Sequence, residues 1–359
     1  MKISRARTGR GDPEVTAVIP CYNYGHYLPE AVGSVLGQAG VRARVIIVDD
    51  CSTDGSLQVA ERLAREDPRV SVIAHAVNAG HIRTYNDGFA AVETRYVTLV
   101  SADDLVAPGA LGRATTLMEA NVGVGMVYGQ PIEFSDAPPT TDRDGRAPLT
   151  WTVWRGHEWI RLASIRGRCF ILSPEVVMRT DAVREIGGYN VDLPKSGDLE
   201  YWLRTASRWD VGRVNGRVQA YYRQHARNMH AVTLPSMTAD IRHRLLSFAY
   251  LVGDEFAHVS DQGDLFYGKA RNALAREATV LAIRGLDAGG HPTVARELRN
   301  VAIEIKPSAS TSWLMQRLDS RLRRAEAGAA PSAAQRSVEF SRSQLDRIRW
   351  RFWVHTGVS

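Results

Sequence analysis

Tyr96-Val97-Thr98-Leu99-Val100-Ser101-Ala102-Asp103-Asp104 is a short apolar, β-branched run that ends in two adjacent carboxylates. A strand buried in a parallel sheet has this composition, and ligands of such sheets bind where the strands end. Two adjacent acids at such a position are costly unless a positive group neutralises them, and a divalent metal carrying a diphosphate is one such group. A solvated turn or a helix N-cap before Leu105 is the alternative that this stretch alone leaves open.

Three further apolar runs precede this stretch at regular spacing, and each ends in polar or turn-forming residues. We expect strands there, at residues 15–20, 44–50 and 70–74. Helical patterns lie between the runs, at residues 29–38, from Ser52-Thr53-Asp54 onward, and at about 81–91. Strands that alternate with helices predict an α/β fold, with a central, mostly parallel sheet flanked by helices on both faces. The polar strand ends then share one edge of the sheet: Cys21-Tyr22-Asn23, Asp49-Asp50, Asn78 and Asp103-Asp104.

Six motifs occur in order between about residues 14 and 230. They are Val18-Ile19-Pro20-Cys21-Tyr22-Asn23, Val48-Asp49-Asp50-Cys51-Ser52-Thr53-Asp54-Gly55, Asn78-Ala79-Gly80, Ser101-Ala102-Asp103-Asp104, Gly187-Gly188-Tyr189 and Ser196-Gly197-Asp198-Leu199-Glu200-Tyr201-Trp202-Leu203-Arg204. Together they resemble glycosyltransferase family 2, the inverting enzymes that use nucleotide-diphosphate sugars. The resemblance implies the GT-A fold, a Rossmann-like sheet of nucleotide-diphospho-sugar transferases, and transfer of a sugar to an acceptor hydroxyl.

The resemblance implies a nucleotide-sugar site at the strand ends. Its residues would be Pro20, Tyr22, Asn23, Asp50, Asn78, Gly80, Ser101, Ala102 and Asp103. Tyr22 would lie against the nucleobase, where an aromatic face supplies area and stacking. Asp50 would accept the ring N–H of uracil. Asp49 is the alternative for that role, although strand alternation places the two acids on opposite faces.

The resemblance also implies a metal site. Asp103 matches the metal-binding carboxylate of the family's Asp-x-Asp motif, and His225 resembles the histidine that completes the metal or diphosphate site. Ser101 stands at the first acidic position of the motif, and its hydroxyl adds no negative charge. We therefore expect weakened metal affinity, with Asp103 as the principal ligand. Magnesium or manganese suits oxygen ligands and a diphosphate. Arg223 and Arg227 are candidates for neutralising that diphosphate.

Asp198 is the predicted general base. Inversion requires the acceptor hydroxyl to attack from the face opposite the leaving nucleotide, and a positioned carboxylate must take its proton. In the family pattern a glutamate precedes this aspartate, whereas Gly197 precedes it here. Glu200 is the second candidate for the base. The alternative is that Asp198 is only the N-cap of a helix over residues 199–207.

Residues 131–170 change in character. Prolines and aspartates predict a long loop, followed by a helical segment that places Trp151, Trp154 and Glu158 on one side. Aromatic faces near a sugar site often contact the acceptor, and core packing is the alternative for tryptophan. The predicted acceptor contacts are Trp151, Trp154, Glu200 and Trp202. Residues 169–172 read as a strand.

Three parts are expected along the chain. They are a basic tail at residues 1–13, a catalytic domain at 14–232 with a nucleotide-sugar half (about 14–120) and an acceptor half (about 121–232), and a helical C-terminal region at 233–359. Helices are predicted there near residues 236–259, 265–288, 292–304, 311–326 and 334–354. Leu314, Leu318 and Leu322 form an apolar stripe among arginines. Such basic helices either pack or self-associate, giving a homo-oligomer, or lie on an anionic membrane surface.

The composition argues against a nucleic-acid partner and indicates the cellular location. The chain has 45 lysines and arginines against 39 acids, for a net charge of +6, but the basic residues are dispersed and no nucleic-acid motif occurs. No apolar segment follows the basic start, and none reaches the roughly twenty residues of a membrane span. The three scattered cysteines fit neither a zinc site nor a paired disulfide set. We therefore expect a cytoplasmic protein, with peripheral contact to the inner face of the plasma membrane as an option.

The activity can be bounded further by resemblance. The chain lacks the Gln-x-x-Arg-Trp motif of processive relatives, which implies non-processive transfer. The family favours UDP or dTDP sugars and a carbohydrate, lipid-linked or small-molecule acceptor, as in polysaccharide, glycolipid or glycosylated natural-product biosynthesis. One alternative is a catalytically silent nucleotide-sugar binder or scaffold acting through its C-terminal helices. A sugar nucleotidyltransferase is disfavoured, because its Gly-rich signature is absent from Cys21-Tyr22-Asn23-Tyr24.

Overall fold

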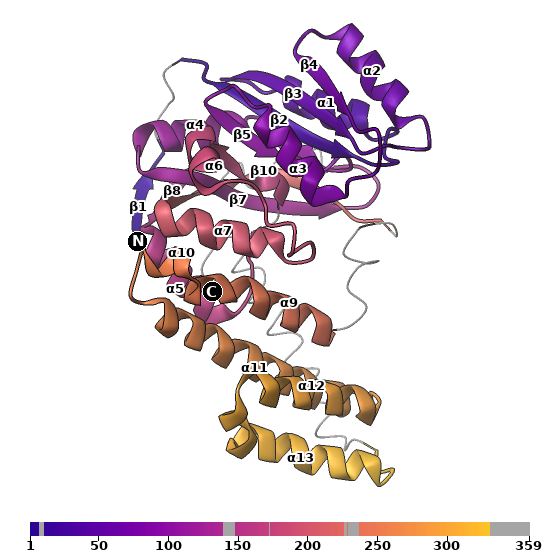
Figure 1. Cartoon of the computed structure of the whole chain (residues 1–359), viewed down its shortest axis with the longest axis vertical. Helices are drawn as coiled ribbons and strands as arrows, with labels where there is room; N and C mark the ends of the chain where they lie inside the picture. The colour runs from indigo at the N-terminus through magenta and orange to yellow at the C-terminus, as the bar shows by residue number, and fades with distance from the viewer. Residues whose placement is uncertain (7–10, 139–147, 172, 226–227, 229–236, 331–359) are drawn as a thin grey trace. The chain divides into compact units, whose positions relative to one another are not determined.

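A computed structural model of the chain describes residues 1–6, 11–138, 148–171, 173–225, 228 and 237–330 (Figure 1). The chain divides into two compact units. The first, here called the sheet unit, comprises Met1–Trp159 and Phe170–Asn228. The second, the helical unit, comprises Ile160–Cys169 and the described part of Met229–Trp353.

The described part of the sheet unit contains one ten-stranded sheet. Its strands are β1 (Lys2–Arg5), β2 (Glu14–Cys21), β3 (Arg42–Asp49), β4 (Val70–Ala74), β5 (Tyr96–Leu99), β6 (Leu105–Val106), β7 (Val124–Phe134), β8 (Thr150–Trp154), β9 (Val177–Arg179) and β10 (Asp210–Arg223). The strand order is β1-β8-β10-β7-β9-β5-β2-β3-β4, and β6 pairs with β10. β5, β2, β3 and β4 run parallel, as do β7 and β10, whereas β9 is antiparallel to both β5 and β7. The predicted mostly parallel sheet is confirmed.

Helices cover both faces of this sheet, as the alternating pattern predicts. They are α1 (Leu28–Leu36), α2 (Ser56–Glu66), α3 (His81–Ala90), α4 (Ala110–Ala120), α6 (Thr180–Ile186) and α7 (Gly197–Arg208), with α5 (Gly156–Arg166) and the short η1 (Ser173–Glu175). Leu28 of α1 and Leu111 of α4 share one buried cluster with Ile19 of β2. α3 packs on the other face of β2, where a Cβ at Gly88 would come within 2.3 Å of Val18. The glycine therefore lets helix and sheet approach closely.

Residues 2–5, which the sequence assigns to a basic tail, form the edge strand β1 antiparallel to β8. The expectation of a loop from residue 131 is wrong at its start, because β7 continues to Phe134. The helical placement of Trp151 and Trp154 is also wrong, since both lie in β8. Phe170 and Ile171 are not in a strand. Local composition did not predict the secondary structure of these segments, because strand formation depends on pairing with segments distant in the sequence.

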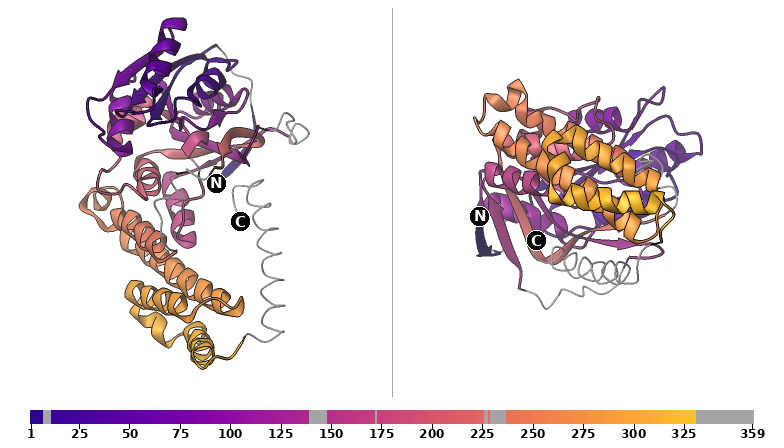
Figure 2. Two further views of the ribbon diagram at one scale, coloured as in Figure 1. Left: turned by 90° about the vertical axis from the view of Figure 1, so that its right-hand side faces the viewer. Right: turned by 90° about the horizontal axis from the view of Figure 1, so that it is seen from below.

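The helical unit is built from α9 (Met237–Ala249), η2 (Tyr250–Val252), α10 (Asp254–Ala257), α11 (Gly263–Asp287), α12 (Pro292–Ile305), η3 (Pro307–Thr311) and α13 (Trp313–Glu326). Both views in Figure 2 show the orange-to-yellow helices α11, α12 and α13 side by side. Met315, Leu318 and Leu322 of α13 are buried, so the stripe runs through Met315 rather than the half-buried Leu314.

Two ion pairs join the last helices of this unit. Arg299 of α12 contacts Asp319 of α13 at 2.5 Å, and Arg321 of α13 contacts the buried Asp287 of α11 at 2.5 Å. The predicted helix at 334–354 lies outside the described residues. None of the helices in the described ranges has the length and apolar character that a membrane crossing requires.

Candidate active site

The carboxyl ends of β2 and β3 are joined by a small hydrogen-bonded turn. Asn23 adopts a left-handed backbone (φ 60°), and its side-chain oxygen accepts from the backbone N–H of Thr53 at 2.8 Å. Its own backbone N–H donates to Ser52 Oγ at 3.0 Å. Cys51 also has φ 60°, a conformation that glycine adopts at less cost. Asn23 therefore fixes the loop after β3 and leaves the neighbouring Tyr22 47% exposed at this edge.

Asp50 is the most fully hydrogen-bonded acid of the edge. His75 Nδ1 lies 2.9 Å from Oδ1, while the backbone N–H groups of Ala79 and Gly80 donate to Oδ1 at 2.6 Å and Oδ2 at 2.9 Å. Burial alone would raise the pKa of this carboxyl, but these hydrogen bonds outweigh it and hold the pKa below its usual value. Asn78 Nδ2 donates to the backbone oxygen of Asp50 at 3.2 Å. Asp50 is thus an ionised, pre-oriented acceptor.

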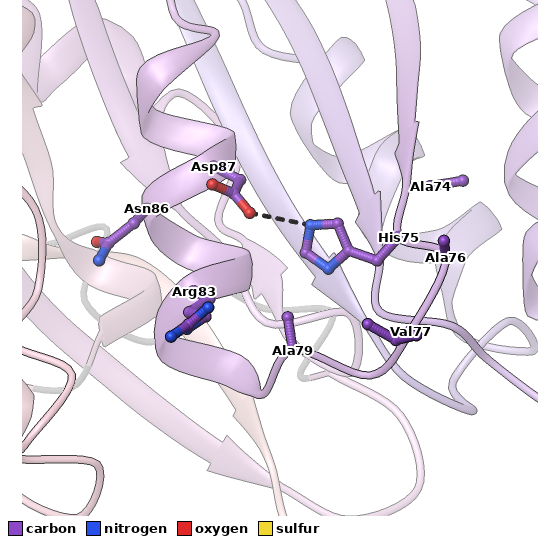
Figure 3. Close-up of a pocket in the computed structure, with 8 residues that line it drawn as sticks. All are labelled: Ala74, His75, Ala76, Val77, Ala79, Arg83, Asn86 and Asp87. Atoms are coloured by element: carbon purple, nitrogen blue, oxygen red, sulfur yellow. Dashed lines mark ion pairs between the residues drawn. The ribbon is translucent and has the colours of Figure 1, made fainter.

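An open depression of about 560 Å³ lies beside this network (Figure 3). Its lining residues come from the end of β4, the following loop and α3: Ala74, His75, Ala76, Val77, Ala79, Arg83, Asn86 and Asp87. The carboxylate of Asp87 lies 3.1 Å from His75 Nε2. The remaining acid of the β3 end, Asp49, accepts the backbone N–H of Ser52 at 3.0 Å, so Asp49 and Asp50 serve different loops.

Asp103 and His225, the two predicted metal ligands, lie together. His225 Nε2 is 2.9 Å from Asp103 Oδ2, although 122 residues separate them in the chain. Tyr24 and Tyr27 pack around the imidazole, with ring centroids 5.6 Å and 5.7 Å away. The backbone N–H of His225 donates to Asn228 Oδ1 at 2.5 Å. These contacts from α1, its preceding turn and the β10 end hold the imidazole beside the carboxylate.

Asp104 next to this pair is buried in a very different environment. Its Oδ1 accepts the backbone N–H of Arg223 at 2.8 Å, and its Oδ2 has no hydrogen-bond partner among the described residues. Burial, followed by the negative charge of Asp103, raises the pKa of Asp104 well above its usual value. An added cation at this edge would relieve both effects.

Arg223 connects the acidic pair to the first helix. Its Nε donates to the backbone oxygen of Asp103 at 2.9 Å, and a terminal N–H donates to Glu30 of α1 at 2.5 Å. The guanidinium also lies over the rings of Tyr27 and Phe134, at 4.8 Å and 4.5 Å from their centroids. Arg223 is therefore committed to internal contacts that hold the loop after β5. Arg227, its companion in the sequence analysis, lies outside the described residues.

The few possible protein ligands suit a metal ion that is bound mainly through the phosphates of a substrate. Within the described ranges, no group of three or more His, Cys, Asp or Glu side chains is placed to hold a metal ion. Asp103 and His225 supply one oxygen and one nitrogen, and Mg²⁺ commonly takes one or two carboxylates together with substrate phosphates and water. The half-buried Ser101 hydroxyl and the buried Ala102 lie directly before Asp103. These residues fit a metal–diphosphate and do not form a closed protein cage.

Asp198 lies in the first turn of α7, two residues after the N-cap Ser196. Asp198 is thus not the N-cap, and its Oδ2 instead accepts from Ser173 Oγ at 2.7 Å. A Cβ added at Gly197 would lie 3.3 Å from the ring of Tyr189, so a larger side chain there would press on this ring. Tyr189 stacks on Tyr201 of α7 with centroids 4.1 Å apart, which anchors the start of the helix.

Tyr85 of α3 connects the two acidic regions. Burial raises the pKa of its phenol, and the negative charges of Asp198, Asp103 and Asp104 raise it further. One phenol therefore feels the predicted base and the predicted metal acids together. Tyr85 contacts Tyr189 edge-on, at 5.5 Å between centroids.

Residues 16–185 match the family model described as glycosyl transferase family 2. They belong to this family. The likeness extends to an uncharacterized glycosyltransferase of Haemophilus influenzae, 28% identical over 194 residues, which cover 53% of this chain and 59% of that protein. The succinoglycan biosynthesis protein ExoO of Rhizobium meliloti is 37% identical over 101 residues, or 28% of each chain. The putative teichuronic acid biosynthesis glycosyltransferase TuaG of Bacillus subtilis is 35% identical over 92 residues, covering 26% of this chain and 36% of that protein.

The matches span less than two thirds of the length of these relatives. A crystal structure of residues 1–349 of S. aureus TarS in complex with UDP superposes with a TM-score of 0.58 at 18% identity, covering 92% of this chain and 91% of that one. This likeness shows the fold, so the expected GT-A architecture is confirmed. The family 2 match ends before Asp198 and His225. Their roles therefore depend on the motifs and the contacts described above.

The residues predicted to contact the acceptor are buried, contrary to expectation. Trp151, Trp154 and Trp202 are 2%, 1% and 2% exposed, so they pack in the interior and present no face to a sugar. Glu200 is buried and forms two hydrogen bonds with Arg204, at 2.8 Å and 3.0 Å. This pairing leaves Asp198 as the better placed acid of α7.

The sequence motifs did not indicate two residues of the candidate site, His75 and Tyr85. His75 directly follows β4, and Tyr85 lies in the second turn of α3. Neither belongs to one of the six motifs, and each acts through residues far away in the sequence. The only available signal was position: His75 follows a predicted strand at the edge where polar strand ends gather. Pro20, half-buried near the end of β2, lies where the nucleotide site was expected.

Proposed function

We propose that this protein is a glycosyltransferase that moves a sugar from a nucleotide-diphosphate sugar to an acceptor hydroxyl with inversion. The observations that support it are that Asp50 and the Asp103–His225 pair lie where β3 and β5 end, and that the charges of Asp103 and of Asp198 on α7 both act on the buried Tyr85. These are the groups needed for base recognition, diphosphate binding and proton abstraction. The family match and the GT-A fold support the same proposal.

Donor binding follows from the chemistry of the edge. The exposed ring of Tyr22 would stack on the nucleobase, and Asp50 would accept a ring N–H of that base. Asp103 and His225 would hold Mn²⁺ or Mg²⁺, which supplies charge neutralisation for the departing nucleoside diphosphate. The Ser101 hydroxyl would hydrogen-bond the ribose or a water bound to the metal.

Proton transfer is assigned to Asp198. Its carboxylate lies in the first turn of α7, where the helix dipole favours a negative charge. The hydroxyl of Ser173 donates to Oδ2 and fixes the direction of the carboxylate. In the reaction, Asp198 would take the acceptor hydroxyl proton as the new glycosidic bond forms.

The substrates are proposed at the level that the comparisons support. We favour UDP or dTDP as the donor nucleotide, since TarS was crystallised with UDP. Two relatives are named for succinoglycan and teichuronic acid biosynthesis, which favours a role in polysaccharide assembly, and the missing Gln-x-x-Arg-Trp motif favours non-processive transfer. A catalytic domain at 14–232, a helical region at 233–359, a cytoplasmic location, self-association and peripheral membrane contact remain parts of this proposal.

The test is release of nucleoside diphosphate from a panel of nucleotide sugars with Mn²⁺. The wild type is compared with Asp198→Asn and Asp103→Ala. Release from one donor, lost in Asp198→Asn and Asp103→Ala, supports the proposal and names the donor. Metal-dependent donor binding without release, in the presence of a range of sugar and lipid-linked acceptors, would favour the silent nucleotide-sugar binder. Absence of any nucleotide binding would overturn both.

A further inference from the structure

His75 lies between two carboxylates that belong to different elements, and Figure 3 shows one of them, Asp87 of α3. His75 Nδ1 is 2.9 Å from Asp50 Oδ1 after β3, and its Nε2 is 3.1 Å from Asp87 Oδ2. The His75 and Asp50 side chains are 12% and 5% exposed, whereas Asp87 is 57% exposed. Nε2 makes no hydrogen bond among the described residues, so the contact with Asp50 is the one that holds the ring.

The contacts of Asp50 decide what the carboxylate can still recognise. An ionised carboxylate only accepts hydrogen bonds, with about four lone-pair sites on its two oxygens. Three donors occupy this one: His75, the Ala79 N–H and the Gly80 N–H. The remaining capacity suits a ligand group that carries an N–H. Uracil and thymine present a ring N–H at their pairing edge, whereas cytosine presents a bare ring nitrogen there.

We propose that His75 is a positioning residue that directs Asp50 at the nucleobase and so sets a preference for uracil-type over cytosine-type nucleotides. The inference depends on the proposed function in one respect, namely that the donor nucleotide binds at Asp50. His75 itself touches no substrate, and its effect passes through the carboxylate that it holds.

The backbone donors hold this carboxylate from one side. Ala79 and Gly80 belong to one loop, which leads into the N-terminus of α3, and each donates to one of the two oxygens. His75 adds a contact to Oδ1 from the β4 end, where its backbone N–H also continues the ladder by donating to Asp49 oxygen at 2.9 Å. Asp50 is therefore held from two directions. Loss of the imidazole contact would leave Oδ1 with the Ala79 N–H alone, so the carboxylate could tilt relative to a bound base.

Two substitutions of His75 separate its contacts. Asn places an amide nitrogen two bonds beyond Cβ, as Nδ1 is in His75, so His75→Asn keeps a donor toward Asp50. Gln carries its amide one bond further, near the Nε2 position, so His75→Gln loses that donor. Asp87→Asn changes a largely exposed side chain that makes no hydrogen bond with the ring among the described residues, and it serves as one control. Val77→Thr, at a 72% exposed residue of the same depression, is the matched control.

The experiment measures binding of UDP, CDP and inorganic diphosphate to the full chain by calorimetry, with Mn²⁺ present. A site that hydrogen-bonds a ligand N–H rejects an analogue lacking it, so the wild type should prefer UDP to CDP by at least about tenfold. His75→Gln should reduce this ratio to about two, as expected for one lost oriented contact. His75→Asn and Val77→Thr should stay within about threefold of the wild-type ratio. Asp87→Asn should also stay within about threefold of the wild-type ratio, and diphosphate binding should not change.

A merely structural role for His75 would weaken UDP, CDP and diphosphate binding alike and leave the ratio unchanged. That result, or a wild type without preference for UDP, overturns the inference while leaving nucleotide binding intact. A wild type that binds none of the probe nucleotides would instead remove the proposed function, and this inference with it. If His75→Gln melts below the wild type, His75→Asn decides the matter, because it also replaces the imidazole but keeps a donor toward Asp50. A lost preference for UDP in His75→Asn would overturn the inference.

Discussion

Asp50 follows β3 and Asp104 lies beyond β5, at the same edge of one sheet, yet their surroundings have opposite effects. Three N–H donors contact Asp50 and hold its pKa below the usual value in spite of burial. Asp104 is buried against Asp103, has one oxygen without a hydrogen-bond partner among the described residues, and has a raised pKa. In the proposed site, the ionised form of the acid assigned to the nucleobase is therefore already stabilised by the protein, whereas the ionised form of Asp104, beside the acid assigned to the metal, is disfavoured.

The largest effect on activity is expected at a third acid, Asp198, which is assigned to proton transfer and not to donor binding. Asp198→Asn keeps the size of the side chain and removes the base, so kcat should fall about 10²- to 10⁴-fold. Donor affinity should stay within about threefold, because Asp198 is assigned to the acceptor side. Steady-state release of nucleoside diphosphate, with donor binding measured in parallel, checks both numbers.

Ser173→Ala is the matched control for Asp198. It removes only the hydroxyl that orients the carboxylate at 2.7 Å. We expect a loss of about tenfold in kcat, on the scale of one oriented hydrogen bond. An equal loss in both variants would mean that Asp198 acts only through its structural contact with Ser173.

Paired substitutions test the comparison most directly. Asp50→Asn loses an ionised acceptor with three donors and should lower the unfolding free energy by about 1–2 kcal/mol. Asp104→Asn removes a buried charge beside Asp103 and should raise it by about 1 kcal/mol. Urea unfolding without divalent metal, at about pH 7.5, measures both. A change of unfolding free energy with the same sign in both variants would show that the two acids do not differ in this way.

The fold was predictable wherever neighbouring strands explain each other. The apolar runs of β2 to β5 end in polar residues, so their common direction and their shared edge follow from the parallel pattern, whereas their order β5-β2-β3-β4 does not. The pairing of Asp103 with His225 was predictable only through the family resemblance, because nothing local joins residues so far apart in the chain.

The remainder depends on contacts that the sequence does not encode locally. Trp151 reads as helical until β8 is known to pair with β10 and β1. His75 and Tyr85 carry no motif, and they matter only because folding places them against Asp50, Asp103 and Asp198. Arg223 looked free to bind a diphosphate, yet its partners are Glu30 and the backbone of Asp103. Such roles emerge from tertiary structure.

The pH dependence of stability sharpens the account of Asp50. A carboxyl whose pKa is depressed on folding contributes fully above the pKa of a free aspartate, about 4, and loses its contribution as the pH falls through the lower folded value. The stability gap between wild type and Asp50→Asn should therefore stay constant from about pH 8 to about pH 5 and close below about pH 4. Urea midpoints over this range measure the gap. A gap that widens in acid would contradict the depressed pKa.

The smallest effect concerns two cysteines at the same edge. Cys21 ends β2, and burial, helped by the charge of Asp49, raises the pKa of its thiol to about 11. Cys51 follows β3, is partly exposed and lies 3.7 Å from the Ala76 oxygen. Since the thiolate is the reactive form, iodoacetamide at about pH 8 should label Cys21 roughly a hundredfold more slowly than Cys51. Peptide mass spectrometry measures both rates, and labelling in urea should equalise them because unfolding removes the burial. Equal labelling rates in the native protein would show that burial at this edge does not suppress ionisation of the Cys21 thiol. The raised pKa of Asp104, which has the same main cause, would then lose its explanation.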